Sequence, residues 1–337
     1  MRNLAVGYFS NEPFIEACEP YLPRIREVYF GWPGVLTCRS TGDDDTQPNL
    51  IDDLRWCREH GVLLDALFNC NCYGERAIGR EMADEAAGVL SDMKRQGLYP
   101  DIVTTTSPFI AHVLKLSDSA LKVRASVNMR IHGSIGFEAC EALFDEFYVS
   151  RENQRDFGYM ARMRDWAALH GKALGMQLNS GCLRQCPYQT FHDNLHGHGR
   201  QRQMSQGRDF GFELFCCKAH FRAGNHEDIL KETWIRPEDC RLWEPYVQVM
   251  KVSTRRVPHP SLIIKAYAER HFDGSLLKLL DPCLEYEFAG KIIDNSAFPP
   301  NWATSGIAAA CANDCSHCGK CAELLGLVER QCHSLSH

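Results

Sequence analysis

Short apolar, β-branched runs alternate with longer amphipathic stretches along most of the chain. Within residues 80–96, Met82, Ala86, Val89 and Met93 recur at spacings of three and four, the period of one face of an α-helix. Strand patterns that alternate with helix patterns are typical of βα units and indicate a parallel sheet. The predicted strands are 4–9, 27–30, 62–68, 102–106, 122–127, 146–149, 173–178 and 247–252, and the predicted helices include 49–60, 80–96 and 154–170.

Eight strands of this kind favour an α/β fold of the (β/α)8 TIM-barrel type, with a doubly wound open sheet as the alternative. The glycine-rich signatures of dinucleotide-binding and phosphate-binding loops are absent from the sequence. The alternation ends near residue 281, where Pro-containing stretches lead into a dense cysteine run. We therefore predict a barrel domain over residues 1–280 and a C-terminal cysteine-rich segment over residues 281–337.

Composition agrees with a packed globular protein. The 337 residues carry a formal net charge of -6, with 45% hydrophobic and 24% charged residues. The mild acidity gives no general field for nucleic-acid binding, although it does not exclude it. No apolar run approaches the roughly 20 residues that cross a bilayer, and polar residues follow the first strand too early for a signal peptide. We expect a cytoplasmic protein that does not bind membranes.

The chain contains 17 cysteines, an odd and unusually large number. Disulfide frameworks belong to short secreted chains, and this chain is long and shows no export signal. Cysteines that cluster in a reducing compartment more often bind metal or carry out redox chemistry. The cysteine content therefore predicts metal sites.

The strongest local motif is a continuous run of four thiols near the C-terminus, Cys311, Cys315, Cys318 and Cys321. Spacings of three, two and two residues let each thiolate reach a corner of a compact [4Fe–4S] cluster, as in ferredoxin motifs. A four-thiolate zinc site is the alternative, although zinc usually draws its ligands from two separated pairs. The predicted role is structural or in electron relay.

A second, more dispersed set of cysteines follows the strand at 173–178. Its members are Cys182, Cys186, the adjacent Cys216 and Cys217, and Cys240. Loops at the carboxyl ends of barrel strands carry the active site, so these thiols can meet on the catalytic face. Buried and inert cysteines are the alternative interpretation.

Histidines, arginines and asparagines near the same predicted strand ends are further candidates. His192, with His196 and His198 close by, can act as an acid or base near neutral pH, or bond to backbone or water as a loop histidine. Asn69 and its neighbours up to Tyr73 are expected either to line a pocket or to pack as a loop.

Charged side chains near strand ends suggest recognition of an anion. Converging guanidinium groups bind a carboxylate or phosphate in bidentate fashion, with structural ion pairs as the alternative. The arginines that carry these guanidinium groups are Arg124, Arg130, Arg151 and Arg255. Proton transfer is assigned to the two ionisable groups best placed for it, Glu152 and Lys251, which could equally form salt bridges.

Several short motifs occur in a characteristic order and carry a family resemblance. They are Lys122-Val-Arg-Ala-Ser-Val-Asn-Met-Arg130, Phe144-Asp-Glu-Phe-Tyr-Val-Ser-Arg-Glu152, Asn179-Ser-Gly-Cys182, Ile235-Arg-Pro-Glu-Asp239, Lys251-Val-Ser-Thr-Arg255 and Ala266-Tyr267. In this order they resemble the peptidase U32 family, whose members carry an Ala-Ser strand, a Ser-Arg-Glu strand end and a Ser-Gly-x-Cys loop. The resemblance covers roughly residues 1–270.

The resemblance implies a barrel-like fold with a [4Fe–4S] cluster held by four cysteines. Motif by motif, the implied ligands are Cys182, Cys186, Cys217 and Cys240, with Cys216 as an alternate for Cys217. Cys38 is a further candidate, because some hydroxylase relatives use an N-terminal cysteine.

The sequence departs from the family pattern in three ways. Met176-Gln-Leu178 replaces the family's His-Gly-Ala, and Cys182 and Cys186 stand closer together than the family's first two ligands. The C-terminal run of four cysteines is not a general family feature. It suggests a specialised branch with two clusters per chain, the second passing electrons to the first.

The resemblance also implies the reaction class. Better understood relatives are oxygen-independent hydroxylases that act on ubiquinone precursors or RNA bases, with prephenate as the oxygen donor. We predict redox modification of a small organic substrate, such as a carboxylate, with an electron donor or related U32-type protein as partner. RNA-base modification and an electron-transfer subunit are the alternatives, and proteolysis is disfavoured because Gly-x-Ser-x-Gly and His-Glu-x-x-His are absent. The predicted catalytic residues are His192, Arg151, Glu152, Lys251 and Arg255.

Overall fold

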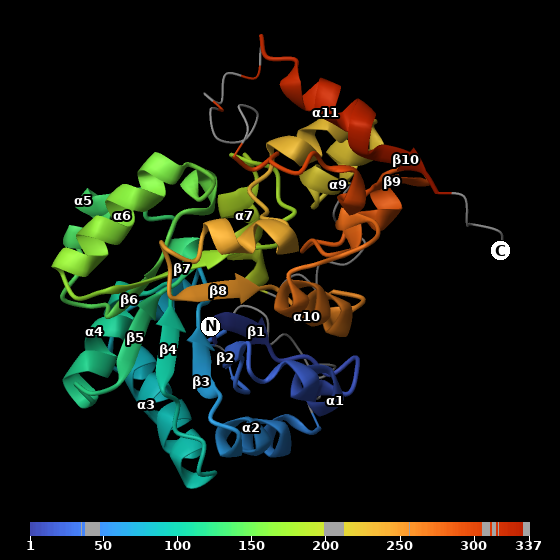
Figure 1. Ribbon diagram of the computed structural model, residues 1–337. Helices are drawn as coiled ribbons and strands as arrows, with labels where there is room; N and C mark the ends of the chain where they lie inside the picture. The colour runs from blue at the N-terminus through green and yellow to red at the C-terminus, as the bar shows by residue number, and fades with distance from the viewer. Residues whose placement is uncertain are drawn as a thin grey trace.

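Eight parallel strands form a closed barrel in the order β1 to β8, with β1 paired to β8. The computed structural model describes residues 1–34, 36–37, 48–198, 212–255, 257–304, 311, 315 and 317–332. The closed barrel confirms the (β/α)8 prediction over the open doubly wound sheet (Figure 1). The barrel strands are β1 Leu4–Gly7, β2 Ile25–Phe30, β3 Leu63–Phe68, β4 Ile102–Thr105, β5 Lys122–Ala125, β6 Glu146–Tyr148, β7 Ala173–Gln177 and β8 Val249–Val252.

Helices follow most strands and cover the outside of the barrel. Local sequence explains several of their starts: Ser107 accepts a hydrogen bond from the Ile110 N–H at the start of α4, and Asp156 accepts one from the Tyr159 N–H at the start of α6. The α-helices are α1 Phe14–Cys18, α2 Leu50–Glu59, α3 Arg80–Arg95, α4 Pro108–Ser117, α5 Ser134–Glu138, α6 Phe157–Leu169, α7 Gln189–His196, α9 Cys216–Arg222, α10 Pro260–Glu269 and α11 Lys320–Val328. No helix in these parts of the chain is long and apolar enough to span a membrane.

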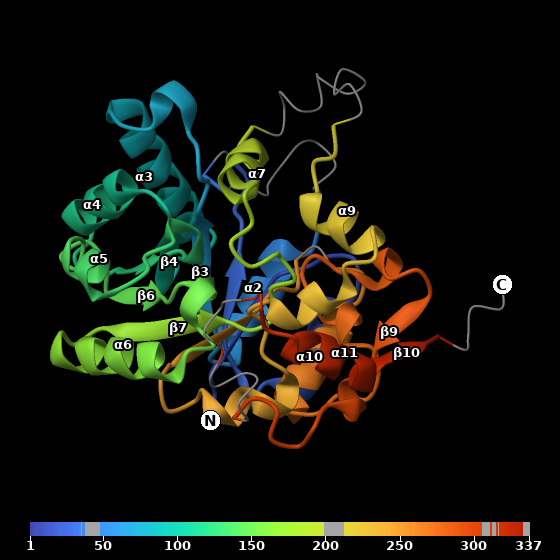
Figure 2. The same ribbon diagram turned by 90° about the horizontal axis from the view of Figure 1, so that it is seen from above.

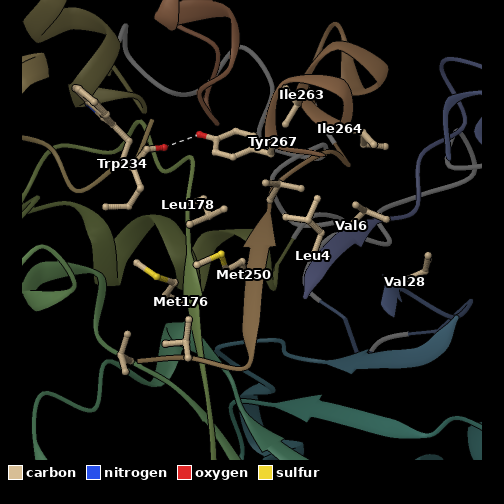
Figure 3. Packing of buried hydrophobic residues seen from close by; sticks show 14 of the residues in the cluster. Leu4, Val6, Val28, Met176, Leu178, Trp234, Met250, Ile263, Ile264 and Tyr267 are labelled. Atoms are coloured by element: carbon tan, nitrogen blue, oxygen red, sulfur yellow. Dashed lines mark hydrogen bonds between the residues drawn. The ribbon is translucent and has the colours of Figure 1, made fainter. Parts of the chain in front are cut away.

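The main hydrophobic core lies between the barrel wall and its helices. Figure 3 shows outward-facing side chains of β1, β7 and β8 beside α10. Leu4, Met176 and Met250 are fully buried there, and Tyr267 of α10 donates a hydrogen bond of 2.8 Å to the carbonyl oxygen of Ile235. This packing fixes the loops that leave β7 and β8.

The chain after α10 packs against the same core. The Asp281 N–H donates to the Asn179 carbonyl (2.8 Å), and the Gly181 N–H donates to the Asp281 carbonyl (2.9 Å), so this segment extends the end of β7. Leu284 and Phe288 belong to the barrel's hydrophobic cluster. Further on, β9 Lys291–Ile293 and β10 Glu329–Gln331 form an antiparallel pair beside α11 (Figures 1 and 2). A separate domain from residue 281 remains a prediction.

Candidate active site

A pocket of about 380 Å³ opens at the carboxyl ends of the strands. The end of β3, residues beyond β7 and β8, helices α7 and α9, and the Asp281–Pro282 pair contribute to its wall. In Figure 1 the arrows of β3 and β4 point towards the side of the barrel where α7 lies. The pocket therefore occupies the face on which barrel enzymes carry their active sites.

Four thiols line this pocket. Cys182 and Cys186 lie on the loop after β7, and Cys216 and Cys217 open α9. The sulfur atoms of Cys186 and Cys216 are 3.4 Å apart. The fold thus brings together residues that the sequence separates by 30 positions.

Burial favours the protonated form of Cys182, Cys186 and Cys217. Burial raises the pKa of Cys186 to about 11, and its hydrogen bond with Cys216 adds to the shift. Burial also raises the pKa of Cys182, and raises that of Cys217 to about 12 with a contribution from the nearby Cys182. A bound metal must displace these protons, since thiolates are the ligands. Across the described ranges, no group of three or more His, Cys, Asp or Glu residues is arranged to hold a metal ion.

The structure does not bring Cys240 to this pocket. Cys240 lies in the 3-10 helix Pro237–Leu242, is fully buried, and has its thiol 3.4 Å from the carbonyl oxygen of Arg236. The Cys240 thiol therefore has partners outside the pocket lining, the Arg236 carbonyl and the neighbouring Arg270. Cys283, which the sequence analysis did not select, follows the pocket-lining Asp281–Pro282 pair. Cys38 lies outside the described residues.

The four C-terminal thiols are placed at the start of α11 and before it. Cys311, Cys315 and Cys318 are exposed, whereas Cys321 is partly buried. Burial raises the pKa of Cys321 to about 11; the charges of Arg155 and Lys231 oppose this shift, and Cys311 and Cys315 add to it. None of these four thiols lines the pocket.

Positive charge dominates the pocket wall. Four cationic side chains line it, against the carboxylates of Asp193 and Asp281. Asp193 is itself paired with Arg130 at 2.5 Å, and Lys218 is paired with Glu287 at 3.4 Å. An anionic molecule is therefore favoured over a cation of the same size. The cationic residues are Arg151, Lys218, Lys251 and Arg255.

Most of the predicted catalytic residues meet at this pocket. His192, on α7, lines it and makes an edge-to-face contact with the Phe215 ring at a centroid distance of 5.1 Å. Arg151 donates a hydrogen bond of 3.1 Å to Ser180 Oγ, which holds the guanidinium beside the Cys182 loop. Lys218 was not selected from the sequence, because only the fold reveals that its helix faces the barrel mouth.

Glu152 does not line the pocket. Its Oε2 accepts a hydrogen bond of 2.9 Å from the Gln185 N–H, and its carbonyl oxygen accepts one of 2.6 Å from Arg184 Nη2. Through these two hydrogen bonds, Glu152 stabilises the Cys182–Cys186 loop. Behind that loop lies Glu232, whose pKa is raised to about 9, chiefly by burial and then by Glu152. Glu232 was not among the residues predicted from the sequence.

Two of the four arginines predicted for anion binding have structural partners instead. Arg124 points into the barrel from the middle of β5 and is ion-paired with Glu27, Asp65 and Glu146. Its position inside the strand, rather than at the strand end, explains the difference.

Arg130 ties the loop after β5 to α7. Besides pairing with Asp193, its Nη1 donates to Thr190 Oγ1 at 2.6 Å. Asn69 lines the pocket, in agreement with one of the two interpretations of its segment. His198 follows α7, and His196 is its last residue.

Comparison with known proteins supports a family assignment. No family model matches the chain. A protein of Methanocaldococcus jannaschii named uncharacterized protease MJ1657 is 26% identical over 310 residues, which cover 88% of this chain and 87% of that protein. The structure of the U32 peptidase Mk0906 shares the fold with a TM-score of 0.54 at 14% identity, over 75% of this chain and 92% of that one. The second similarity shows a shared fold, and both agree with the resemblance to the peptidase U32 family that the sequence motifs carry.

Proposed function

We propose, from the U32 assignment that sequence similarity and fold support, that this chain is an iron–sulfur oxidoreductase. Its reaction would be oxygen-independent hydroxylation, or a related redox modification, of a small organic anion. The observation that carries the proposal is the convergence of four thiols and four cationic side chains on one pocket of about 380 Å³. A pocket of this size suits a small molecule better than an extended peptide.

Cys182, Cys186, Cys216 and Cys217 are the proposed ligands of a [4Fe–4S] cluster. The donor set fits the group, since such clusters take four cysteine thiolates and these four thiols line one cavity. The four sulfur atoms must move together from their present arrangement to hold it. When bound, the cluster supplies one-electron redox chemistry at the pocket. The protein environment around the thiols tunes that chemistry through burial and hydrogen bonds.

The remaining pocket residues bind and orient the substrate. Arg151 and Arg255 present guanidinium groups that match a carboxylate in bidentate geometry. Arg255 packs across the barrel mouth, where a Cβ on Gly7 would lie 2.6 Å from its Cγ, so the absence of a side chain there permits this position. His192 can hold or deliver a proton near neutral pH.

The C-terminal thiols are the proposed ligands of a second cluster. Cys311, Cys315, Cys318 and Cys321 are mostly exposed, which gives an external electron donor access to them. The proposed role of this group is to receive electrons from a partner protein and pass them to the pocket. Zinc is the alternative metal for four thiolates, and metal analysis separates the two.

The test is iron, acid-labile sulfide and zinc per chain in protein purified without oxygen. Two clusters give about eight iron and about eight sulfide, and one gives about four of each. We expect a Cys182→Ser/Cys186→Ser variant and a Cys318→Ser/Cys321→Ser variant each to lose about half the iron, with Cys140→Ser as the unaffected control. Cys140 is a suitable control because it does not line the pocket, and its thiol lies 3.2 Å from the carbonyl oxygen of Gly136 in α5.

Protein without iron contradicts the proposal, and zinc alone ends the redox interpretation. If the Cys182→Ser/Cys186→Ser variant retains all of its iron, the pocket does not hold a cluster. A Cys283→Ser variant shows whether this neighbouring thiol replaces one of the four ligands. Hydrolysis of peptides by the iron-free protein would support a peptidase instead.

A further inference from the structure

The side-chain ammonium group of Lys251 lies between two tyrosine rings inside the barrel mouth. Its Nζ is 4.1 Å from the ring centroid of Tyr29 and 5.3 Å from that of Tyr148. Lys251 is only 8% exposed, yet it lines the pocket. Aromatic faces stabilise a desolvated cation through their quadrupoles, so this arrangement favours the ammonium over the neutral amine.

Glycines in two barrel strands make room for this pair of rings. A Cβ on Gly7 of β1 would lie 2.7 Å from the Tyr29 ring, and one on Gly175 of β7 would lie 2.6 Å from the Tyr148 ring. The Tyr29 hydroxyl donates to a β8 carbonyl at 2.9 Å, and the Tyr148 hydroxyl accepts from an Arg124 guanidinium nitrogen at 3.3 Å. Each ring is thus held by a hydrogen bond at its hydroxyl group and packs closely against a glycine of the barrel wall.

A layer of buried carboxylates lies deeper in the barrel. Glu27, Asp65 and Glu146 surround the guanidinium of Arg124. Arg26 is a second cation at this layer, 3.4 Å from Glu27 and 3.6 Å from Glu146, so three carboxyl groups share two guanidinium groups. Burial, then Glu27, raises the pKa of Asp65 to about 7, whereas Arg124 and Lys251 act to lower it. The interaction is reciprocal, so ionised Asp65 stabilises the Lys251 cation.

We propose that the tyrosine pair and the carboxylate layer hold Lys251 as a fixed cation that binds a carboxylate of the substrate. Lys251 is then an anion-binding residue and not the proton-transfer group that the sequence suggested. Arg255, which lines the same pocket, is the like-charged neighbour that joins it in binding the anion. The anion-binding role rests on the proposed function, whereas the fixed charge does not.

The fixed charge is tested by an NMR titration of protein labelled at the lysine ε-carbons, with Lys251→Met identifying the resonance. Burial alone would favour the neutral amine, so we expect the two rings and Asp65 to keep Lys251 protonated well above neutral pH. Tyr148→Leu should lower the proton affinity of Lys251 about tenfold, whereas Tyr148→Phe keeps the ring and most of the effect. A Lys251 that loses its proton near neutral pH overturns the fixed cation.

Anion binding is tested by calorimetry with malonate as the probe. We expect Lys251→Met to weaken binding at least tenfold, Lys251→Arg to retain most of it, and Lys265→Met to leave it unchanged. Equal loss in Lys251→Arg and Lys251→Met, or no malonate binding by the unaltered protein, overturns the anion-binding role. Such a result, with a high titration pH for Lys251, would leave the fixed charge standing and contradict only the substrate class.

Discussion

Replacing Arg124 with methionine tests the charge layer inside the barrel. Arg124 is 1% exposed and donates to Glu27 at 2.5 and 2.9 Å, to Glu146 at 2.5 and 2.8 Å, and to Asp65 at 3.1 Å. Methionine fills much of the same volume but leaves Arg26, which pairs with Glu27 and Glu146, as the remaining guanidinium beside three carboxyl groups. Removal of one partner of a buried ion pair costs about 3–5 kcal/mol, and we expect the loss to fall within that range.

The stability lost in the Arg124→Met variant should depend on pH. Burial of Glu146 opposes ionisation, but Arg124 outweighs it and holds the pKa of Glu146 below its ordinary value. In the unaltered protein Glu146 therefore contributes stability that is present above about pH 4.3 and is lost as the pH falls. Without Arg124 the carboxyl groups take up protons more readily, so the penalty should shrink as the pH falls.

Urea unfolding followed by circular dichroism, at about pH 7.5 and about pH 5, measures both effects. Arg130→Met is the matched control, because the Arg130–Asp193 pair is partly exposed and its loss should cost at most about 1 kcal/mol. A loss below about 1 kcal/mol for Arg124→Met, or a penalty that grows towards low pH, would refute the reasoning.

Two further changes test the packing that supports the site. Asp156→Ala removes the cap of α6, which accepts from the Tyr159 N–H, and should lower the free energy of unfolding by about 1 kcal/mol; no change in urea midpoint would contradict the cap. Gly175→Ala places a Cβ 2.6 Å from the Tyr148 ring and should cost about 1–3 kcal/mol. Its control, Gly88→Ala in α3, meets no atom within 4 Å and should stabilise by about 0.5–1 kcal/mol, so equal effects would refute the steric argument.

The repeating pattern of strands was readable from the sequence because each strand is a short apolar run between amphipathic helices. Strand ends were less predictable. The predicted strand at 122–127 ends at Ala125, because Ser126 accepts a hydrogen bond from the Asn128 N–H and starts a 3-10 turn. A local side-chain contact of this kind overrides the apolar pattern that continues through Val127.

The sequence predicted which face of the barrel carries the site, but not which side chains meet there. The order of strands placed Cys182 and Cys186 at the carboxyl end of β7, and the structure places them there. Whether Cys216 or Cys240 approaches them depends on how the long segment between β7 and β8 folds back. The spacing of the cysteines along the sequence does not determine that path. Arg124 shows the same limit, since only barrel closure brings the partners from β2 and β3 to its guanidinium.

The pairing of β1 with β8, together with the contact between Asn179 and Asp281, has a consequence for biosynthesis. A ribosome makes the first strand some 245 residues before its neighbour Val249–Val252, and the last wall of the pocket later still. Until then, the thiols after β7 belong to an open sheet with an unpaired edge, a state prone to aggregation. Recombinant production should therefore depend on chaperone supply and on slow translation at low temperature more than on the stability of the finished protein.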